Sequence, residues 1–438
     1  MFDTLFSQVT VVTMDAENRV LYGAYVGVSQ GKITYVGEQP PAETALRVVK
    51  GPRRVLMPGL INAHTHVPMT ALRGVSDDEN LQDWLEKHIY PREDRWDSRA
   101  VYWTTQLGLA DMMASGTTSF SDMYYFCDDI AKAVAQSGMK ANLSRSMLLF
   151  TPELDWGSHQ GARETRELVE NWHNCDSGRI LVDVSIHAEY TSHEKLWEKA
   201  AAYARENGLG MQVHLSETER EHNECVAKYG LTPAAVLNHS DLFGTRTTAA
   251  HCVWVTDDDM DILAARGVHA VHNPVSNLKL SSGVARVTEL RKKGVNVALG
   301  TDSVASNNSH DLFEEIKLAA IGQKNRTRNP KVMAGGEALI MATRSGAQAQ
   351  GRALETGCVA VGYDADLILL DFDKPHLWPC LDVISQLTYA VRGSDVCLTM
   401  VRGDILYRDG VFLTLDMERI RAELGGYVLP LLGLEDRL

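Results

Sequence analysis

The sequence predicts an α/β protein in which a (β/α)8 TIM barrel is joined to a small β-sandwich domain formed from both chain ends. Three observations predict this architecture. The chain has 438 residues, which suits a barrel of about 250 to 350 residues plus a smaller domain. Eight apolar, β-rich runs alternate with helical runs in the middle of the chain, and short strand patterns separated by tight turns fill both ends.

The two ends of the chain share one pattern of short strands. Gln30-Gly31-Lys32 marks a tight turn near the N-terminus, and Arg402-Gly403-Asp404 marks a hairpin near the C-terminus. Because chain ends often lie close together, we expect residues 1–57 and 356–438 to form one composite β-sandwich domain with a C-terminal helical tail. Residues 58–355 then form the barrel.

The central segment supplies the barrel strands. The eight candidates are residues 56–64, 117–123, 140–148, 180–188, 211–216, 247–255, 268–273 and 295–302. The helical runs between them end at glycines, as helices with a left-handed C-cap do, and these are Gly116, Gly138, Gly208, Gly267 and Gly294. Alternating strand and helix predicts a parallel sheet with covered faces, and a count of eight favours closure into a barrel.

The composition excludes several classes of protein. With 45% hydrophobic and 23% charged residues, the chain is typical of a soluble globular protein. A formal net charge of -14 argues against a nucleic-acid partner, because phosphate binding needs clustered Lys and Arg, and favours a small neutral or cationic substrate. The sequence contains neither a membrane-spanning apolar run nor a secretory leader, so we expect a cytoplasmic protein without membrane contact.

The seven cysteines are scattered and form no C-x-x-C motif. We therefore interpret them as reduced thiols that mostly fill the core. Cys252 lies next to His251 and has the appearance of a nucleophile or a ligand. Adjacent strand residues point to opposite faces, so we do not expect these two side chains to share a site.

Histidines at strand ends are the candidate metal ligands. His64 and His66 lie two apart at the end of an apolar run, so a strand places both on one face. Alone this pair is weak evidence in a chain with fifteen histidines. Four further polar residues end other strands at the same rim, where barrel enzymes build their sites, and these are His187, His214, His251 and Asp302. The alternative, a set of core histidines with a capping aspartate, requires all of them to reach one rim by coincidence.

These residue types fit a catalytic metal. Three imidazoles and one carboxylate suit one divalent ion, zinc best, with iron(II) or manganese as alternatives. If one ligand position is left for water, the metal lowers the pKa of that water and makes it a nucleophile at neutral pH. Asp302 can then accept its proton, and Glu217, three residues after His214, is the candidate proton donor to the substrate rather than a solvated helix start.

The motifs resemble the amidohydrolase superfamily, in its branch of aminohydrolases and chlorohydrolases that act on purine and triazine rings. The resemblance covers nearly the whole chain, and its carriers are PGLINAHTH (58–66), GTTSFSDM (116–123), VHLSE (213–217), AAHCVW (249–254), HNPVSNLKL (272–280), LGTDSVASNN (299–308) and GYDADL (362–367). The stretch DWLEKHIYPRED is most similar to methylthioadenosine and adenosylhomocysteine deaminases.

The resemblance implies roles for individual residues. The metal ligands that it implies are His64, His66, His214 and Asp302. The catalytic residues that the resemblance implies are Glu217, His251 and Asp302. Glu217 is the proton shuttle, and His251 steers the nucleophile and the leaving group. The substrate contacts that it implies are Trp84 on the nucleoside, Glu93 on the ribose hydroxyls, His187 on the ring, and Arg145 and Arg163 on a carboxylate of the 5′ substituent.

Two features qualify these substrate contacts. Without the resemblance, Trp84 and Glu93 are typical of an amphipathic helix that buries the tryptophan and exposes the glutamate. The branch also carries proline two residues after His187, where this chain has Glu189. A carboxylate near the pocket favours a different or more cationic substituent.

The expected activity is hydrolytic deamination of a 5′-substituted adenosine, such as methylthioadenosine, adenosylhomocysteine or 5′-deoxyadenosine, to the inosine analogue and ammonia. One alternative is a guanine, 8-oxoguanine or pterin deaminase or a triazine chlorohydrolase of the same superfamily. Another is a metal-stabilised binding protein without activity, which predicts missing catalytic groups, whereas Glu217, His251 and Asp302 are present. We expect a small nucleoside as ligand and at least a homodimer.

Overall fold

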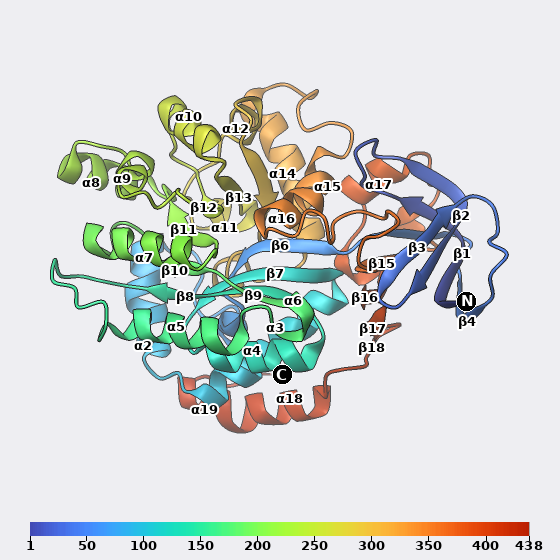
Figure 1. Cartoon of the computed structure of the whole chain (residues 1–438), viewed down its shortest axis with the longest axis horizontal. Coiled ribbons are helices and arrows are strands. Elements are labelled where there is room, and N and C mark those ends of the chain that lie inside the picture. The colour runs from blue at the N-terminus through green and yellow to red at the C-terminus, as the bar shows by residue number, and fades with distance from the viewer. Residues whose placement is uncertain (438) are drawn as a thin grey trace.

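The computed structural model describes residues 1–437, and its architecture agrees with the predicted fold class. A parallel barrel surrounded by helices forms the larger part (Figure 1). A second sheet, made of strands from both ends of the chain, lies to one side of it.

Eight neighbouring strands form the barrel, in the order β6-β7-β8-β10-β11-β12-β13-β14, and all their pairings are parallel. They are β6 Leu60–Thr65, β7 Thr117–Tyr124, β8 Lys140–Met147, β10 Val184–Ile186, β11 Met211–Leu215, β12 Thr247–His251, β13 His269–His272 and β14 Asn296–Leu299. The fourth expected strand is divided at Asp183, and its first part is β9 Ile180–Val182. A parallel bridge between Thr65 and Asp302 joins the first strand to the segment after the last.

Helices cover the outside of the barrel (Figure 1). The longer ones are α3 Ser98–Ala114, α4 Cys127–Ser137, α5 Gln160–Trp172, α7 Glu194–Glu206, α8 Glu219–Tyr229, α10 Asp257–Arg266 and α14 Leu312–Thr327. The shorter ones are α6 Cys175–Gly178, α9 Pro233–His239, α11 Pro274–Lys279, α12 Val287–Lys292, α13 Val304–Asn307, α15 Glu337–Met341 and α16 Arg344–Ala349. Gly138 and Gly267 end α4 and α10 with φ of 83° and 65°, which is the predicted left-handed C-cap.

A short helical segment between β6 and α3 reaches over the mouth of the barrel. It begins with the 3₁₀ turn Val67–Leu72 and continues through α1 Leu81–Trp84, a π turn Leu85–Ile89 and α2 Tyr90–Glu93. The side chain of Asn80 accepts the backbone N–H of Asp83 and so starts α1. Single π turns are common at functional sites, and this one separates Trp84 from Glu93.

The second sheet combines both chain ends. Its strands are β1 Phe2–Val12, β2 Val20–Ser29, β3 Lys32–Gly37, β4 Ala45–Lys50, β5 Arg54–Pro58, β15 Leu367–Asp371, β16 Val396–Val401, β17 Asp404–Arg408 and β18 Val411–Phe412. The sheet branches at β1, which pairs with β2 along one edge and with β4 and then β5 along the other. Antiparallel pairing of β5 with β15 joins the two chain ends, and the sheet has a hydrophobic core of its own that includes Phe6 and Leu369.

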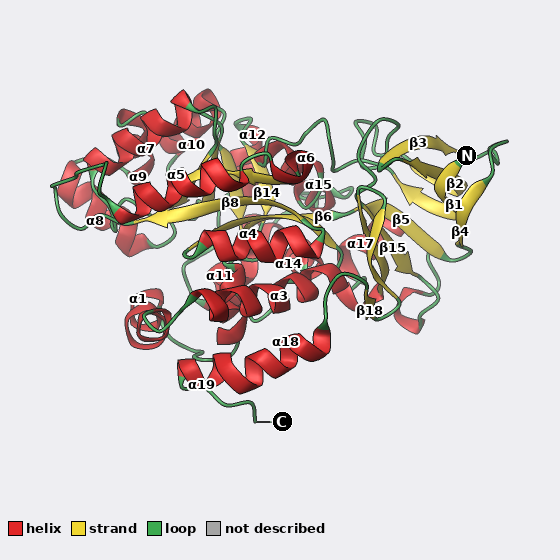
Figure 2. Cartoon of the chain, turned by 60° about the horizontal axis from the view of Figure 1, so that its bottom comes forward, coloured by secondary structure: helices red, strands yellow, loops and turns green. Residues whose placement is uncertain are grey.

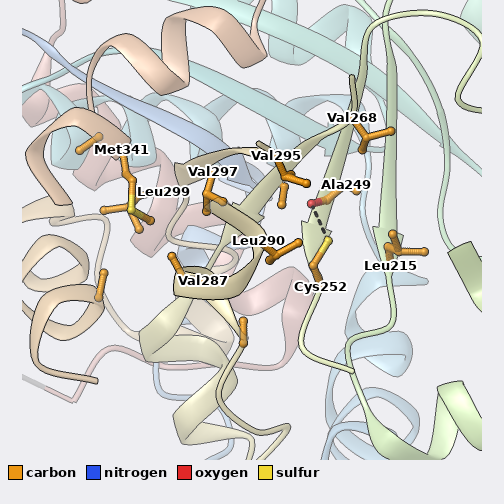
Figure 3. Packing of buried hydrophobic residues seen from close by; sticks show 14 of the residues in the cluster. Leu215, Ala249, Cys252, Val268, Val287, Leu290, Val295, Val297, Leu299 and Met341 are labelled. Atoms are coloured by element: carbon orange, nitrogen blue, oxygen red, sulfur yellow. Dashed lines mark hydrogen bonds between the residues drawn. The ribbon is translucent and has the colours of Figure 1, made fainter. Parts of the chain in front are cut away.

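Apolar residues of the strands and the covering helices pack into one large core (Figure 3). Cys252 lies inside it, with its thiol against the carbonyl of Ala249 and near Leu215 and Leu290 (Figure 3). Burial raises the pKa of the Cys252 thiol, so this cysteine is core filler, as the strand geometry predicts. Cys380 is exposed instead.

The C-terminal tail packs on its own barrel. Helices α18 Met417–Glu423 and α19 Leu429–Leu432, joined by a π turn, run below α3 (Figure 2). Ile420, Val428 and Leu432 are buried in the cluster that also contains residues of α3. Among residues 1–437 no helix combines the length and the apolar character needed to cross a bilayer.

Candidate active site

The barrel rim gathers the histidines that were singled out at strand ends. The ring of His64, on β6, lies 4.9 Å from the rings of His66 and His214 and 5.5 Å from that of His251, measured between centroids. The ring of His187 lies 4.7 Å from that of His214. Parallel strands end at one edge of a barrel, so histidines that lie far apart in the sequence meet here.

Four of these side chains direct ligand atoms at one point. His66 Nε2 lies 3.3 Å from Asp302 Oδ1 and 3.3 Å from His214 Nε2, and His64 Nε2 lies 3.6 Å from the same Asp302 oxygen. Ligands at about 2.0–2.1 Å from a tetrahedral zinc ion stand roughly 3.3–3.4 Å apart. His64 Nε2 is buried and has no hydrogen-bond partner among residues 1–437. The spacing and this unpaired nitrogen fit a bound divalent metal.

Backbone groups fix which nitrogen of each ring is free. Nδ1 of His66 lies 2.6 Å from the Met123 carbonyl, and Nδ1 of His214 lies 2.8 Å from the His187 carbonyl. A carbonyl only accepts, so both Nδ1 atoms carry the proton and both Nε2 atoms keep a lone pair for a metal. Burial, together with the neighbouring histidines, lowers the pKa of His214 well below its ordinary value.

The Asp302 carboxylate is held on its other side by hydroxyls. Ser276 and Ser306 donate to Oδ2 at 2.6 and 2.9 Å, which leaves Oδ1 facing the histidines. Asp302 and His251 have φ of 59° and 73°. A left-handed backbone is rare outside glycine and is typical of functional sites.

Glu217 stands beside this cluster as a buried acid. Its Oε2 lies 3.7 Å from Nε2 of His251. Burial raises the pKa of the Glu217 carboxyl well above its ordinary value, and the charges of Asp302 and Glu221 raise it further. Burial lowers the pKa of His251 to about 3. Burial thus favours the protonated carboxyl of Glu217 and the neutral imidazole of His251, which suits a proton donor and a hydrogen-bonding neighbour.

A cavity opens from the cluster towards the helical segment over the barrel mouth. This inner cavity is lined by His66 and Asp302 on one side and by Trp84 and Glu93 on the other. Trp84 is only 5% exposed, and Glu93 Oε1 accepts a hydrogen bond of 2.5 Å from Tyr124. A plain amphipathic helix would bury Trp84 and expose Glu93. Trp84 is indeed buried, but the prediction of an exposed Glu93 is wrong, because this side chain lines the cavity after the π turn.

A second, outer cavity adjoins the first. His187, Tyr125 and Glu93 line both, and Arg145 lines only the outer one. Arg163 lines neither cavity of the described chain; its side chain is 56% exposed and faces Glu167, one turn further along α5. The structure thus brings together the residues singled out in sequence, with Arg163 as the exception.

The deciding comparison concerns residues 55–406, which match the model of the amidohydrolase family. The chain belongs to the amidohydrolase family. A 5′-deoxyadenosine deaminase of Methanosarcina acetivorans is 42% identical over 426 residues, with 97% of both chains covered. A 5-methylthioadenosine/S-adenosylhomocysteine deaminase of Acetivibrio thermocellus is 39% identical over 420 residues, covering 95% of this chain and 96% of the relative. A solved structure of an adenosine deaminase from Xanthomonas campestris with bound zinc superposes with a TM-score of 0.93 at 32% identity, covering 99% of each chain.

Glu189 does not lie where the sequence predicted, which was near the substrate pocket of this amidohydrolase. It lines neither cavity of the described residues but is buried behind the loop that carries Glu217. It lies beside Glu221, whose carboxylate accepts the backbone N–H groups of Ser216 and Glu217 at 2.7 Å each. The expectation that Glu189 favours a cationic substituent is therefore wrong, because this side chain is buried beside Glu221 and faces neither cavity.

This buried carboxyl predicts a pH-dependent stability. Burial and the Glu221 charge raise the pKa of Glu189, so the folded protein keeps it protonated at neutral pH, whereas an unfolded glutamate titrates near about 4.3. The stability linked to Glu189 is complete below that value and is lost as the pH rises. We expect Glu189→Gln to raise Tm by roughly 2–4 °C at pH 8 and to leave it unchanged at pH 4, measured by scanning calorimetry. The exposed Glu198→Gln serves as control; an equal gain at both pH values would contradict the assignment.

Several residues of this amidohydrolase site were not singled out in sequence. Tyr124 receives a hydrogen bond from Trp96 at 2.9 Å and passes one to Glu93. Asn277 lies 2.9 Å from Nδ1 of His251. The only signal for Tyr124 was its place directly after the strand motif GTTSFSDM, and Asn277 and Ser276 lie within HNPVSNLKL.

Proposed function

We propose that this amidohydrolase hydrolytically deaminates 5′-substituted adenosines, giving the inosine analogue and ammonia. The observation that carries the proposal is the inner cavity, in which the candidate ligands His66 and Asp302 face Trp84 and Glu93. The acid Glu217 lies beside the same cluster, 3.7 Å from His251. The relatives described above are named as deaminases of nucleosides of this class, and their similarity to this protein extends over nearly the whole chain.

One divalent metal belongs to this proposal. His64, His66, His214 and Asp302 would hold it, and three nitrogens with one oxygen suit zinc best, ahead of iron(II) or manganese. When bound, the metal supplies Lewis acidity that activates a water molecule. The zinc in the Xanthomonas campestris structure supports this choice.

The chain's own residues then move the protons. The protonated carboxyl of Glu217 donates to the ring nitrogen beside the amino-bearing carbon, so the charge that builds on the ring is neutralised. Asp302, held by two serine hydroxyls, accepts the proton of the attacking water and passes it to the departing amine. His251 keeps a neutral imidazole beside both and orients the nucleophile and the leaving group.

The substrate contacts follow the shape of the cavity. Trp84 packs on the nucleoside, Glu93 binds the ribose hydroxyls, and His187 contacts the ring. Tyr124 orients Glu93 through the hydrogen bond already described. A free base or a triazine has no ribose for Glu93 to bind, which favours a nucleoside over the other ring substrates of the superfamily. The presence of all three catalytic groups speaks against a silent binding protein.

Glu93→Gln tests the nucleoside assignment. We expect kcat/KM for 5′-deoxyadenosine to fall about 100-fold, because a carboxylate accepts from both ribose hydroxyls and an amide oxygen does so more weakly. Glu86→Gln, an exposed residue of the same helical segment, should behave like wild type. Zinc content by mass spectrometry should equal one atom per chain in all three proteins. Unchanged nucleoside kinetics in Glu93→Gln would contradict the ribose contact.

A further inference from the structure

The outer cavity is placed to receive the 5′ group of a nucleoside. It shares Glu93, Tyr125 and His187 with the inner cavity, so a ribose held at Glu93 would stand where the two cavities meet. Phe126 and Phe150 add to its aromatic wall. The chemistry of this cavity therefore decides which 5′ substituents fit.

Arg145 is the only cation among the lining residues of the outer cavity, and its charge is already balanced. Its Nε donates to the carboxylate of Glu164, and its Nη1 donates to the Ser146 carbonyl. The guanidinium also stacks over the ring of Tyr125 at 4.7 Å. The Arg145 side chain is 12% exposed and that of Glu164 is 32% exposed, so the ion pair is partly buried and holds the guanidinium in place.

Glu164 is itself held in position by its helix. Gln160, one turn earlier on α5, donates to Glu164 Oε1 at 2.7 Å. Both residues line the outer cavity, whereas Glu167 lies on another face of α5 and pairs with Arg163. A substrate carboxylate that approaches Arg145 must therefore compete with the charge of a carboxylate that is already oriented.

The charges around the outer cavity oppose an anion as well. Glu93, Asp94 and Glu164 supply three carboxyl groups against the single guanidinium of Arg145. A carboxylate placed there is repelled unless it takes over the Arg145 contact, and like charges at close range reduce affinity. An uncharged methyl or methylthio group meets only the aromatic wall and avoids this penalty.

We infer that Glu164 is a specificity-determining residue, which occupies Arg145 and thereby excludes 5′ substituents that end in a carboxylate in favour of small uncharged ones. This inference rests on the proposed nucleoside deaminase function. It differs from the sequence expectation, in which Arg145 meets a substrate carboxylate.

The test compares three nucleosides that differ only at the 5′ end. They are 5′-methylthioadenosine, its 5′-(3-carboxypropyl)thio analogue and its 5′-(3-aminopropyl)thio analogue, which are neutral, anionic and cationic at pH 7.5. For wild type we expect kcat/KM for the anion to be lowest. In Glu164→Gln the ratio of kcat/KM for the anion to that for methylthioadenosine should rise about tenfold, because Arg145 becomes free to bind the carboxylate. The dissociation constants of the three inosine products, measured by calorimetry, should follow the same order.

Two further variants make the result specific. Glu167→Gln removes a carboxylate from the same helix away from the cavity and should leave the ratio unchanged. The double variant Glu164→Gln/Arg145→Gln should lose the gain, because the gain depends on the guanidinium. A ratio that is unchanged in Glu164→Gln, or a wild type that prefers the anion, would overturn the inference while deamination itself continues. Absence of ammonia from all three nucleosides with zinc-loaded wild type would instead overturn the proposed function, and the inference with it.

Discussion

The Glu217→Gln variant is expected to lose about 10³- to 10⁴-fold in kcat while it still binds one metal ion per chain. Glutamine has nearly the shape of glutamic acid but no acidic proton to give to the ring nitrogen. In wild type, burial raises the pKa of Glu217 and so favours the form that carries this proton. The measurements are steady-state ammonia release and metal content by mass spectrometry.

A neighbouring variant separates this effect from a general loss of charge. Glu219 lies two residues further on, is exposed, and begins α8. Glu219→Gln should therefore turn over like wild type. Full activity in Glu217→Gln would contradict its role as the proton donor, whatever the metal content.

Removal of the metal is the second large effect. Dialysis against a chelator should abolish ammonia release, and stoichiometric zinc should restore it, because water without a Lewis acid is a poor nucleophile at neutral pH. His66→Ala should bind zinc at least about 10-fold more weakly, because one of the four converging ligand atoms is lost.

The control for the histidine variant is His239→Ala, an exposed residue at the end of α9, which should keep both zinc and activity. A metal-free preparation that deaminates at the wild-type rate would contradict a metal-dependent reaction. The retention of zinc by His66→Ala would contradict the assigned ligand set.

Much of this architecture could be predicted from periodicity alone. Apolar strands alternate with helices that end at glycines such as Gly138 and Gly267, and local turn geometry requires those glycines. Placing His64 and Asp302 at strand ends then follows from the topology, because a closed parallel barrel has a single C-terminal rim. Neither residue had to be located by a contact.

Other features depend on contacts between distant segments and had no local signal. Arg163 is exposed on α5 and lines neither cavity, whereas Gln160 and Glu164 on the same helix line the outer one. The position of Glu189 depends on Glu221, which lies in a distant part of the sequence. Sequence patterns define the faces of a helix but not which face meets a ligand.

The most direct test of the central proposal is ammonia release by purified, zinc-loaded protein with a panel of ring substrates. The panel contains 5′-deoxyadenosine, methylthioadenosine, adenosylhomocysteine, adenosine, guanine, 8-oxoguanine, a pterin and a chlorotriazine, with the products identified by mass. We predict that kcat/KM for 5′-deoxyadenosine and methylthioadenosine exceeds that for every free base and for the triazine by about 10³-fold or more. Turnover confined to free bases or the triazine would contradict the assignment of Trp84 and Glu93 to a nucleoside and leave only the metal centre in place.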